Sequence, residues 1–337
     1  MIITRTPLRI SFLGGGTDLP AFSSRYGGAC LSTTINKYIY ITINDSFDGK
    51  FRAKYSETEV VDRPNEFRHP LIREALLYMR CTRPVTITSV ADIPACTGLG
   101  SSSAFTVGLL NALESGCGES LASCLSCAPR VREDAEREAL ARRAGSVEMI
   151  RCAKPVGMQD HYAAALGGWR LYAFHIDGTV SVRKVFSGVS FPEAGRFLLF
   201  YTGLSRLADV ILADESSAIA GDAEKQHTLV LMADMARRGA TALEKGKYCE
   251  FGRLLHESWQ MKRTLAAGIS SPKIDYWYQQ AIAAGALGGK VCGAGGGGFL
   301  LFYVPHGHEV AVRHALAELR EVPFSYDPQG STVIYAD

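Results

Sequence analysis

Residues 93–113, which read IPACTGLGSSSAFTVGLLNAL, combine a proline, a short run of glycine and serine, and an uninterrupted apolar segment. This pattern predicts a loop whose backbone N–H groups point in one direction at the N-terminus of a helix. Aligned peptide dipoles place roughly half a positive charge at that end, and glycines let the backbone approach a ligand closely. Serine hydroxyls there can cap the helix or reach a metal that is bound to a phosphate. The segment therefore predicts an anion site, most often a phosphate site.

Two further glycine-rich loops stand at Gly14–Asp18 and Gly293–Gly298. Taken singly, each is about as typical of a tight turn as of a ligand site, but three such loops in one chain favour ligand binding. The pattern G-x-x-x-x-G-K-[S/T] does not occur, which excludes a Walker-type phosphate loop. The last loop precedes an apolar strand rather than a helix, which is the reverse of the order in a dinucleotide-binding fold.

Two acidic residues are candidates for a role in a functional site. Asp160 follows a Pro/Gly turn within PVGMQDHYAAALGG and begins a helix of small residues, so it is either a helix N-cap or a carboxylate directed into a cleft. Glu148 lies twelve residues upstream, near the end of a charged helix. Its immediate neighbours Val147, Met149 and Ile150 are apolar, which favours a side chain that faces inward.

Composition limits the classes of protein that this chain can represent. The length of 337 residues predicts two domains, and a formal charge of +2 gives no support for binding to nucleic acid or to a membrane surface. Nine cysteines fit reduced thiols in a cytoplasmic protein better than a disulfide framework. Cys124 and Cys127 form one C-x-x-C, interpreted as helix-packing thiols because no second pair stands at zinc spacing. We expect no signal peptide and no membrane span.

Periodicity predicts the elements that must position these residues. In the first half we expect strands at Ile2–Thr6, Leu8–Leu13, Tyr38–Ile43 and Val85–Val90, helices at Ala104–Leu113 and Val131–Ile150, and a hairpin from Trp169–Phe174 and Val180–Val185. In the second half we expect strands at Phe197–Tyr201, within Lys290–Val304 and at Ser331–Ile334, and helices near Leu207–Ala220, Thr228–Lys245, Tyr248–Ala267, Ile274–Ala284 and His308–Leu319. The mixture lacks strict β-α-β alternation, so the predicted class is α+β. The domain boundary is predicted near Gly188–Gly195.

The glycine loops and the Asp160 segment, in this order, resemble the GHMP kinase superfamily, which phosphorylates sugars, homoserine and mevalonate. The matching motifs are Pro7-Leu8-Arg9 leading to Thr17-Asp18, then Pro94 to Ser102, then Gly293–Gly297. The resemblance covers almost the whole chain. It implies an N-terminal ATP-binding domain at 1–190, similar to ribosomal protein S5 domain 2, and a ferredoxin-like C-terminal domain at 191–337.

Within that superfamily the chain looks most like the D-glycero-D-manno-heptose 7-phosphate kinases. The strings that carry this similarity are LGGGTDLPAF, INKYIYI, GMQDHYAAALGG, YTGLSR and GALGGKVCGAGGGGFLLFY. Galactokinase-like members have Glu-His where this chain has Gly15 and Gly16. That difference opens room beside the sugar and argues against galactose as the substrate.

The resemblance assigns roles to matched positions. The loop that would cradle the phosphates of ATP comprises Gly98, Leu99, Gly100, Ser101, Ser102 and Ser103. Ser102 and Glu148 would bind Mg²⁺, for which hard oxygen ligands are suited. Asp160 would accept or orient the proton of the attacking sugar hydroxyl, and Arg9 would hold Asp160 ionised and offset charge in the transition state.

The acceptor implied by the resemblance is a small sugar phosphate. Asp18 would hydrogen-bond the sugar hydroxyls, and the loop at Gly293–Gly297 would close the site near the transferred phosphate. The predicted substrate-binding residues are Gly15, Gly16, Thr17, Asp18, Lys37, Arg206, Gly295 and Gly296, with Lys262 and Lys290 as further candidates for the substrate phosphate.

The leading hypothesis is a cytoplasmic ATP- and Mg²⁺-dependent kinase, a monomer or homodimer, acting on the anomeric hydroxyl of a heptose 7-phosphate. The product, a 1,7-bisphosphate, would serve nucleotide-activated heptose and surface polysaccharide synthesis. Two alternatives stay open: a sister kinase for fucose or a uronic acid, and a non-catalytic sensor that binds ATP and sugar. A nicotinamide oxidoreductase is disfavoured by the order of strands around the glycine loops.

Overall fold

The first half of the molecule is built on a large sheet in the computed structural model, which describes residues 1–116, 132–186, 197–204 and 208–337. Within those residues the sheet has eight strands in the order β12-β1-β2-β5-β3-β4, with β6 and β7 attached through β2. They are β1 (Ile2–Leu13), β2 (Gly28–Asp45), β3 (Phe51–Lys54), β4 (Thr58–Val61), β5 (Val85–Ala91), β6 (Arg170–Phe174), β7 (Val180–Lys184) and β12 (Thr332–Ala336). The pairing of β3 with β5 is parallel and the others are antiparallel.

The long strands β1 and β2 position the site. The two stretches expected before Gly14 form the single strand β1, and Pro7, which lacks an N–H, lies where the register with β2 shifts. Strand β2 extends well beyond the expected Tyr38–Ile43, because its first half pairs with β1 on one side and with β6 on the other. The Gly14–Asp18 loop joins β1 to the short helix α1 (Pro20–Tyr26).

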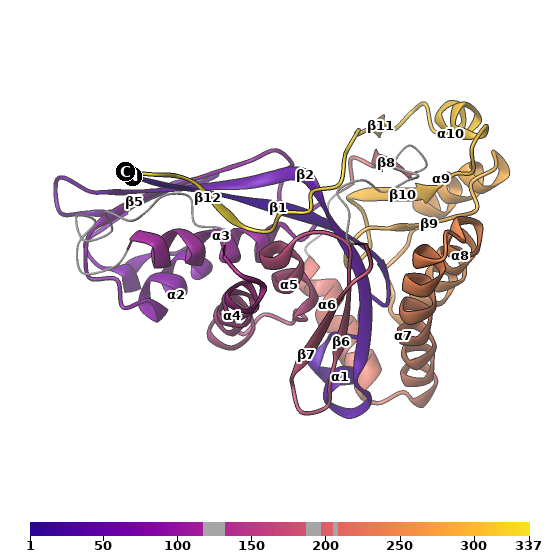
Figure 1. Cartoon of the computed structure of the whole chain (residues 1–337), viewed down its shortest axis with the longest axis horizontal. Helices are drawn as coiled ribbons and strands as arrows, with labels where there is room; N and C mark the ends of the chain where they lie inside the picture. Colours follow the sequence, from indigo (N-terminus) through magenta and orange to yellow (C-terminus); the bar gives the residue numbers. More distant parts are fainter. Residues whose placement is uncertain (117–131, 187–196, 205–207) are drawn as a thin grey trace.

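Helices α2 (Pro70–Tyr78), α3 (Ser101–Gly116), α4 (Asp134–Gly145) and α5 (Gln159–Leu166) cover one face of this sheet (Figure 1). The short 3-10 helix η1 (Pro64–Glu66) precedes α2. Nearly every residue of α3 is buried, because the helix is apolar on most sides and packs against β1, β2 and α5. The phosphate-loop motif therefore sits at the start of a helix that is fixed in the core.

The helix expected over Val131–Ile150 is divided in the structure. Its first residue lies outside the described residues, α4 ends at Gly145, and the chain continues as the π-helix η3 (Ser146–Arg151). Single π turns are rare and often occur at functional sites. Here the turn carries Glu148, whose side chain is fully buried.

The second half has a sheet of four described strands in the order β11-β8-β10-β9. The strands are β8 (Phe197–Tyr201), β9 (Gly288–Val291), β10 (Phe299–Tyr303) and β11 (Arg320–Glu321), and the helices are α6 (Ala208–Ala220), α7 (Ala223–Glu244), α8 (Tyr248–Leu265), α9 (Pro272–Ala283) and α10 (Glu309–Ala315). A second apolar cluster, with Phe200, Trp259, Trp277 and Phe302, fills the space between this sheet and its helices. Helices α7 and α8 lie side by side, with α8 against β9 and α7 against β2 of the first sheet (Figure 1).

Several expectations from the sequence are confirmed. The class is α+β, the hairpin of β6 and β7 forms, and β8 has the expected bounds. The expected boundary near Gly188–Gly195 lies outside the described residues, so the division into 1–190 and 191–337 stays a proposal. The last strand, β12, returns to the first sheet and pairs with β1.

Six described cysteines are free thiols, and Cys124 and Cys127 lie outside the described residues. Among the helices of the described ranges, none has the length and apolar character required to cross a membrane.

Candidate active site

The centre of the candidate site is a partly buried ion pair between β1 and α5. Arg9 Nε and Nη2 donate to the two carboxylate oxygens of Asp160 at 2.7 and 2.6 Å, and Arg9 Nη1 donates to the carbonyl oxygen of Gly98 at 2.7 Å. The N-cap position of α5 is held by Met158, and Asp160 lies in the first helical turn with its carboxylate directed at Arg9. The Asp160 side chain is 25 % exposed and that of Arg9 is 6 % exposed, so the carboxylate is the member of the pair that a ligand can reach.

Electrostatics keep this arginine charged. Burial alone would lower the pKa of Arg9, but the charge and hydrogen bonds of Asp160 outweigh it and the pKa is raised. A bidentate pair of this kind fixes the plane of the carboxylate as well as its position. The Asp160 oxygens are therefore held in one orientation before any ligand binds.

A second carboxylate, Asp18, lies close to the first. It accepts long hydrogen bonds of 3.3 Å from the backbone N–H groups of Gly16 and Gln159. Burial and repulsion by Asp160 raise the pKa of Asp18 in spite of those hydrogen bonds. The neighbouring Thr17 hydroxyl donates to the carbonyl of Ala29 at 3.0 Å, so its side chain anchors the loop to β2.

The third carboxylate, Glu148, binds the start of α3. Ser102 Oγ donates to Glu148 Oε1, and Ser103 Oγ donates to Oε2 at 3.1 Å. The structure adds two residues that the sequence reasoning missed. Lys154 Nζ lies 3.1 Å from Ser102 Oγ and 3.5 Å from Glu148 Oε1, and His161 Nε2 lies 2.9 Å from Glu148 Oε2.

These contacts stabilise the ionised form of Glu148. Burial raises its pKa, but hydrogen bonds from His161 and Ser102 and the charge of Lys154 outweigh burial and lower the pKa to about 2. Because an ionised carboxylate can only accept hydrogen bonds, His161 Nε2 must be the donor. No local sequence pattern predicts the contact of His161 with Glu148, because the two residues meet only when α5 folds back beside the π turn.

The loop before α3 has the conformation that its glycines require. Gly98 and Gly100 have φ values of +86° and +76°, which side chains other than that of glycine rarely adopt. The helix begins at Ser101, so the N–H groups of its first turn have no acceptor within the helix. A Cβ on Gly98 would overlap the carbonyl oxygen of Cys292, which places the loop directly against the third glycine-rich loop.

That third loop is packed backbone against backbone. The N–H of Gly296 donates to the carbonyl of Ile269 at 2.8 Å, and a Cβ on Gly295 would lie 2.6 Å from the same oxygen. Gly293 meets Gly98, and Gly298 meets Thr97. The loops at 98–103 and 293–298 are therefore adjacent, as the resemblance implied, and each limits the space available to the other.

The candidate cations differ in their surroundings. Lys262 is paired with the buried Glu215 and donates to the carbonyl of Gly15 at 3.2 Å. Lys290 is 7 % exposed, and its Nζ has one hydrogen bond, to the carbonyl of Phe12 at 3.4 Å, within the part of the chain that the structure describes. Its Nζ lies 3.9 Å from a Cβ built on Gly15.

The other two candidate cations are Lys37 and Arg206. Lys37 lies half-buried in the bulge of β2 opposite Pro7 and Leu8, and no ion pair connects it to the site within the described ranges. Arg206 lies outside the described residues.

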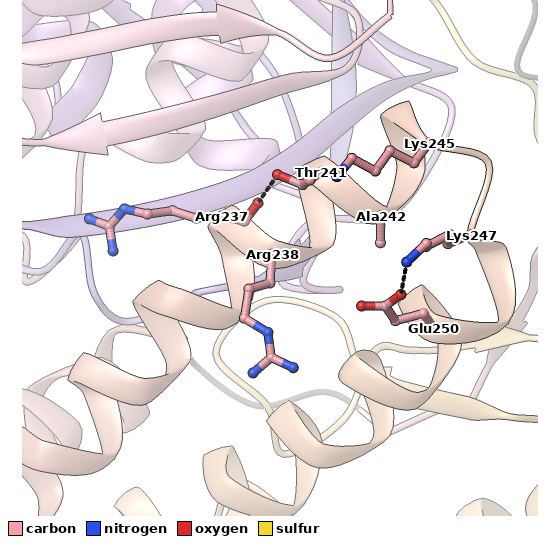
Figure 2. A pocket seen from close by; sticks show the side chains of 7 residues that line it. All are labelled: Arg237, Arg238, Thr241, Ala242, Lys245, Lys247 and Glu250. Atoms are coloured by element: carbon pink, nitrogen blue, oxygen red, sulfur yellow. Dashed lines mark hydrogen bonds and ion pairs between the residues drawn. The ribbon is translucent and has the colours of Figure 1, made fainter.

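A surface pocket between α7 and α8 is a separate feature. Its lining is mostly basic, from Arg237, Arg238, Lys245 and Lys247, with Thr241, Ala242 and Glu250 (Figure 2). The basic side chains come from an exposed helix end and are solvated. None of the candidate site residues lines this pocket.

Phosphoryl transfer requires little covalent chemistry from a protein; it requires a phosphate cradle, oxygen ligands for a metal and a carboxylate beside the attacking hydroxyl. The arrangement described above defines a small-molecule kinase. Two family models support this class: residues 70–168 match the GHMP kinases N terminal domain, and residues 240–321 match the GHMP kinases C terminal model. The chain belongs to the GHMP kinases, which makes it a phosphotransferase with a hydroxyl group as acceptor.

Individual relatives are sugar kinases. The chain is 28% identical over 328 residues to the D-glycero-alpha-D-manno-heptose 7-phosphate kinase of Campylobacter jejuni, covering 90% of this chain and 89% of that protein. It is 26% identical to the L-fucokinase/L-fucose-1-P guanylyltransferase of Bacteroides fragilis, covering 92% of this chain but 35% of that protein. The crystal structure of a D-glycero-D-manno-heptose 1-phosphate kinase from Bacteroides thetaiotaomicron has 26% identity to this chain and a TM-score of 0.74, covering 98% of each chain.

Proposed function

We propose that this GHMP kinase uses ATP and Mg²⁺ to phosphorylate the anomeric C1 hydroxyl of D-glycero-D-manno-heptose 7-phosphate, giving the 1,7-bisphosphate. Similarity to the Campylobacter jejuni protein supports the sugar, and that similarity extends over most of both chains. Gly15 and Gly16, in place of the Glu-His of galactokinase-like loops, support an acceptor other than galactose.

In this proposal the acceptor hydroxyl meets Asp160. The exposed edge of its carboxylate orients the hydroxyl and accepts its proton as the bond to phosphorus forms. Arg9 keeps the carboxylate in place through two hydrogen bonds and offsets negative charge in the transition state. Asp18 lies on the same side and accepts from the sugar hydroxyls.

The donor phosphates of ATP bind the amides of residues 98–103 and the N-terminus of α3. Ser102 Oγ and Glu148 Oε1 converge as hard oxygen donors, which fits Mg²⁺ once phosphate oxygens and water complete its coordination. The described residues offer no cluster of three His, Cys, Asp or Glu side chains for a metal, as expected for an ion that arrives with its nucleotide. When bound, Mg²⁺ neutralises charge on the donor phosphates, and Lys154 adds a positive charge beside the same oxygens.

The observation that carries the choice of a phosphorylated acceptor is Lys290. Of the cations in the candidate site, Arg9 is neutralised by Asp160 and Lys262 by Glu215. Lys290 has no carboxylate within 4 Å in the described ranges, and burial lowers its pKa to about 8. A buried ammonium without a counter-ion is costly, and a substrate phosphate would supply the missing charge.

A panel assay tests this proposal. ADP release is measured with D-glycero-D-manno-heptose 7-phosphate, the unphosphorylated heptose, L-fucose and D-glucuronate, and phosphorus NMR locates the new phosphate. We expect turnover with the heptose 7-phosphate and a product phosphorylated at C1. Turnover of unphosphorylated sugars alone would reject the proposed acceptor, and ligand binding without ADP formation would favour the sensor.

The role of Lys290 is tested with the same assay. Lys290→Met should raise KM for the heptose 7-phosphate about 10- to 100-fold, the effect of losing a hydrogen bond to a charged group, and leave KM for ATP nearly unchanged. Lys37→Met is the control, because Lys37 is the candidate cation on β2 that lies apart from Gly15, and it should behave like the wild type. An equal rise in KM for both substrates would place Lys290 at the donor phosphate instead.

A further inference from the structure

A carboxylate lies on the buried face of α6. Ile211, Glu215 and Ile219 are spaced by four residues, so they share one face of the helix. Both isoleucines belong to the second apolar cluster, and Glu215 itself is fully buried. Its position is therefore determined by the core on either side, and its charge must be balanced by a neighbour.

Lys262 of α8 provides that balance at the substrate loop. Its Nζ donates to Glu215 Oε1 and to the carbonyl of Gly15. A Cβ built on Gly16 would overlap Glu215 Oε1 and would lie 2.9 Å from Lys262 Nζ. The pair thus occupies the place that a side chain at position 16 would take. The space expected beside Gly16 is filled from α6 and α8.

One oxygen of this carboxylate has no partner. Glu215 Oε2 is buried and makes no hydrogen bond to any residue in the described ranges. A buried acceptor left without a donor is costly, and such groups are rare in folded proteins. The carboxyl carbon of Glu215 lies 3.5 Å from a Cβ built on Gly16, in the loop that carries Asp18, so a hydroxyl donor bound beside that loop would satisfy the second oxygen.

We infer that Glu215 Oε2 accepts a hydrogen bond from a hydroxyl of the acceptor sugar and thereby helps to select the sugar. This inference deepens the proposed function and rests on it, since it assumes that the acceptor occupies the Gly15–Asp18 loop. Glu215 is a specificity residue supplied by the second half of the molecule. Lys262 is a positioning residue: it holds the other carboxylate oxygen and leaves Oε2 for the sugar.

The alternative role for the pair is purely structural, as a buried link between α6 and α8. The two roles predict different results when both residues are replaced by apolar ones. Replacing a buried ion pair by side chains of similar volume is often neutral for stability. A Glu215→Met/Lys262→Met double variant therefore keeps the fold while removing the acceptor oxygen.

The experiment measures KM for D-glycero-D-manno-heptose 7-phosphate and for ATP, together with the melting temperature, in wild type, Glu215→Gln and the double variant. We expect KM for the sugar to rise about 10- to 100-fold in both variants, as for loss of a hydrogen bond to a charged group. KM for ATP should change less than about threefold. For the wild type, a deoxy analogue that lacks the contacted hydroxyl should have a higher KM than the parent sugar. In both variants this difference in KM should disappear.

The matched control is Glu114→Gln, which removes another largely buried carboxylate, one that binds Arg143 at 2.6 Å on the far part of α3. It should alter stability and leave both KM values unchanged. A double variant with wild-type KM for the sugar would overturn the inference. Absence of turnover by the wild-type chain would instead contradict the proposed function, and the comparison of KM would then use whichever sugar of the panel the wild type phosphorylates.

Discussion

Arg9 and Asp160 are 151 residues apart in sequence and form a bidentate contact at the centre of the candidate site. Each residue has a reason to be where it is: Arg9 lies on a buried strand that needs a counter-charge, and Asp160 lies at a helix N-terminus that favours an anion. The pairing leaves only the exposed edge of the carboxylate for a ligand. That edge is where an attacking hydroxyl would have to bind.

Asp160→Asn is predicted to lower kcat about 10²- to 10⁴-fold, the range expected for loss of a general base, while the dissociation constant of ATP stays within about threefold. Steady-state ADP release and nucleotide titration measure the two quantities. Asp134→Asn is the matched control, because Asp134 also lies in the first turn of a helix and pairs with a buried arginine, Arg170, at 3.4 Å. Near-normal turnover in Asp160→Asn would remove Asp160 from the catalytic role.

The sequence predicted some of these residues and not others, for physical reasons. Arg9, Ser102 and Asp160 stand in motifs with fixed local spacing, so a resemblance could select them. Lys154 and His161 reach Glu148 only because the chain folds back from a π turn to α5, which no local pattern encodes. A signal for Glu215 was present, since a carboxylate between Ile211 and Ile219 interrupts an apolar stripe.

Among the elements, the π-helix η3 determines the direction of the Glu148 side chain. The extra residue of a π turn shifts the side chains that follow, and here Glu148 faces the serines of α3 instead of solvent. Periodicity over Val131–Ile150 predicted a continuous helix, because an insertion of one residue leaves the charge pattern of α4 intact. Element type was thus predictable, whereas the local geometry that directs Glu148 was not.

The buried carboxylate on η3 predicts a particular acid sensitivity. The pKa of Glu148 is about 2 in the folded chain against an ordinary 4.5. A carboxyl group with a lowered pKa stabilises the fold above pH 4.5, and this contribution is lost as the pH falls towards 2. It amounts to about 3 kcal/mol in full and about 1 kcal/mol at pH 3, a loss of about 2 kcal/mol.

Urea unfolding at pH 7 and pH 3 measures this loss. Glu148→Gln should be less stable than wild type at pH 7, and the difference between the two proteins should shrink by about 2 kcal/mol at pH 3. Glu57→Gln, which replaces an exposed carboxylate, is expected to follow the wild type at both pH values. A constant difference between Glu148→Gln and wild type would contradict the assigned pKa.

At the scale of the whole molecule, the candidate site lies where the two halves meet. The first half contributes Arg9, Asp160 and the loop before α3, and the second half contributes Glu215, Lys262 and Lys290. The halves are joined by backbone contacts between glycine loops, and the chain then returns through β12 to the first sheet. Sequence patterns predicted each loop, but the direct contact between the loops depends on the packing of two sheets.

Gly298 tests whether that contact sets the geometry of the site. A Cβ on Gly298 would overlap the carbonyl oxygen of Thr97, just before the phosphate loop, and Gly298 also bonds Thr202 and Leu204 of the second half. Gly298→Ala should therefore push the loops apart and lower kcat/KM about 10- to 100-fold, the effect of a small misplacement of reacting groups.

Gly178→Ala is the control, because Gly178 has a φ of +82° against +80° for Gly298 but no atom within 4 Å of its Cβ. Both variants incur backbone strain of about 1–3 kcal/mol, so both should melt at lower temperature. Only Gly298→Ala should lose activity at a temperature where both are folded, and equal activity in the two variants would show that the loops tolerate separation.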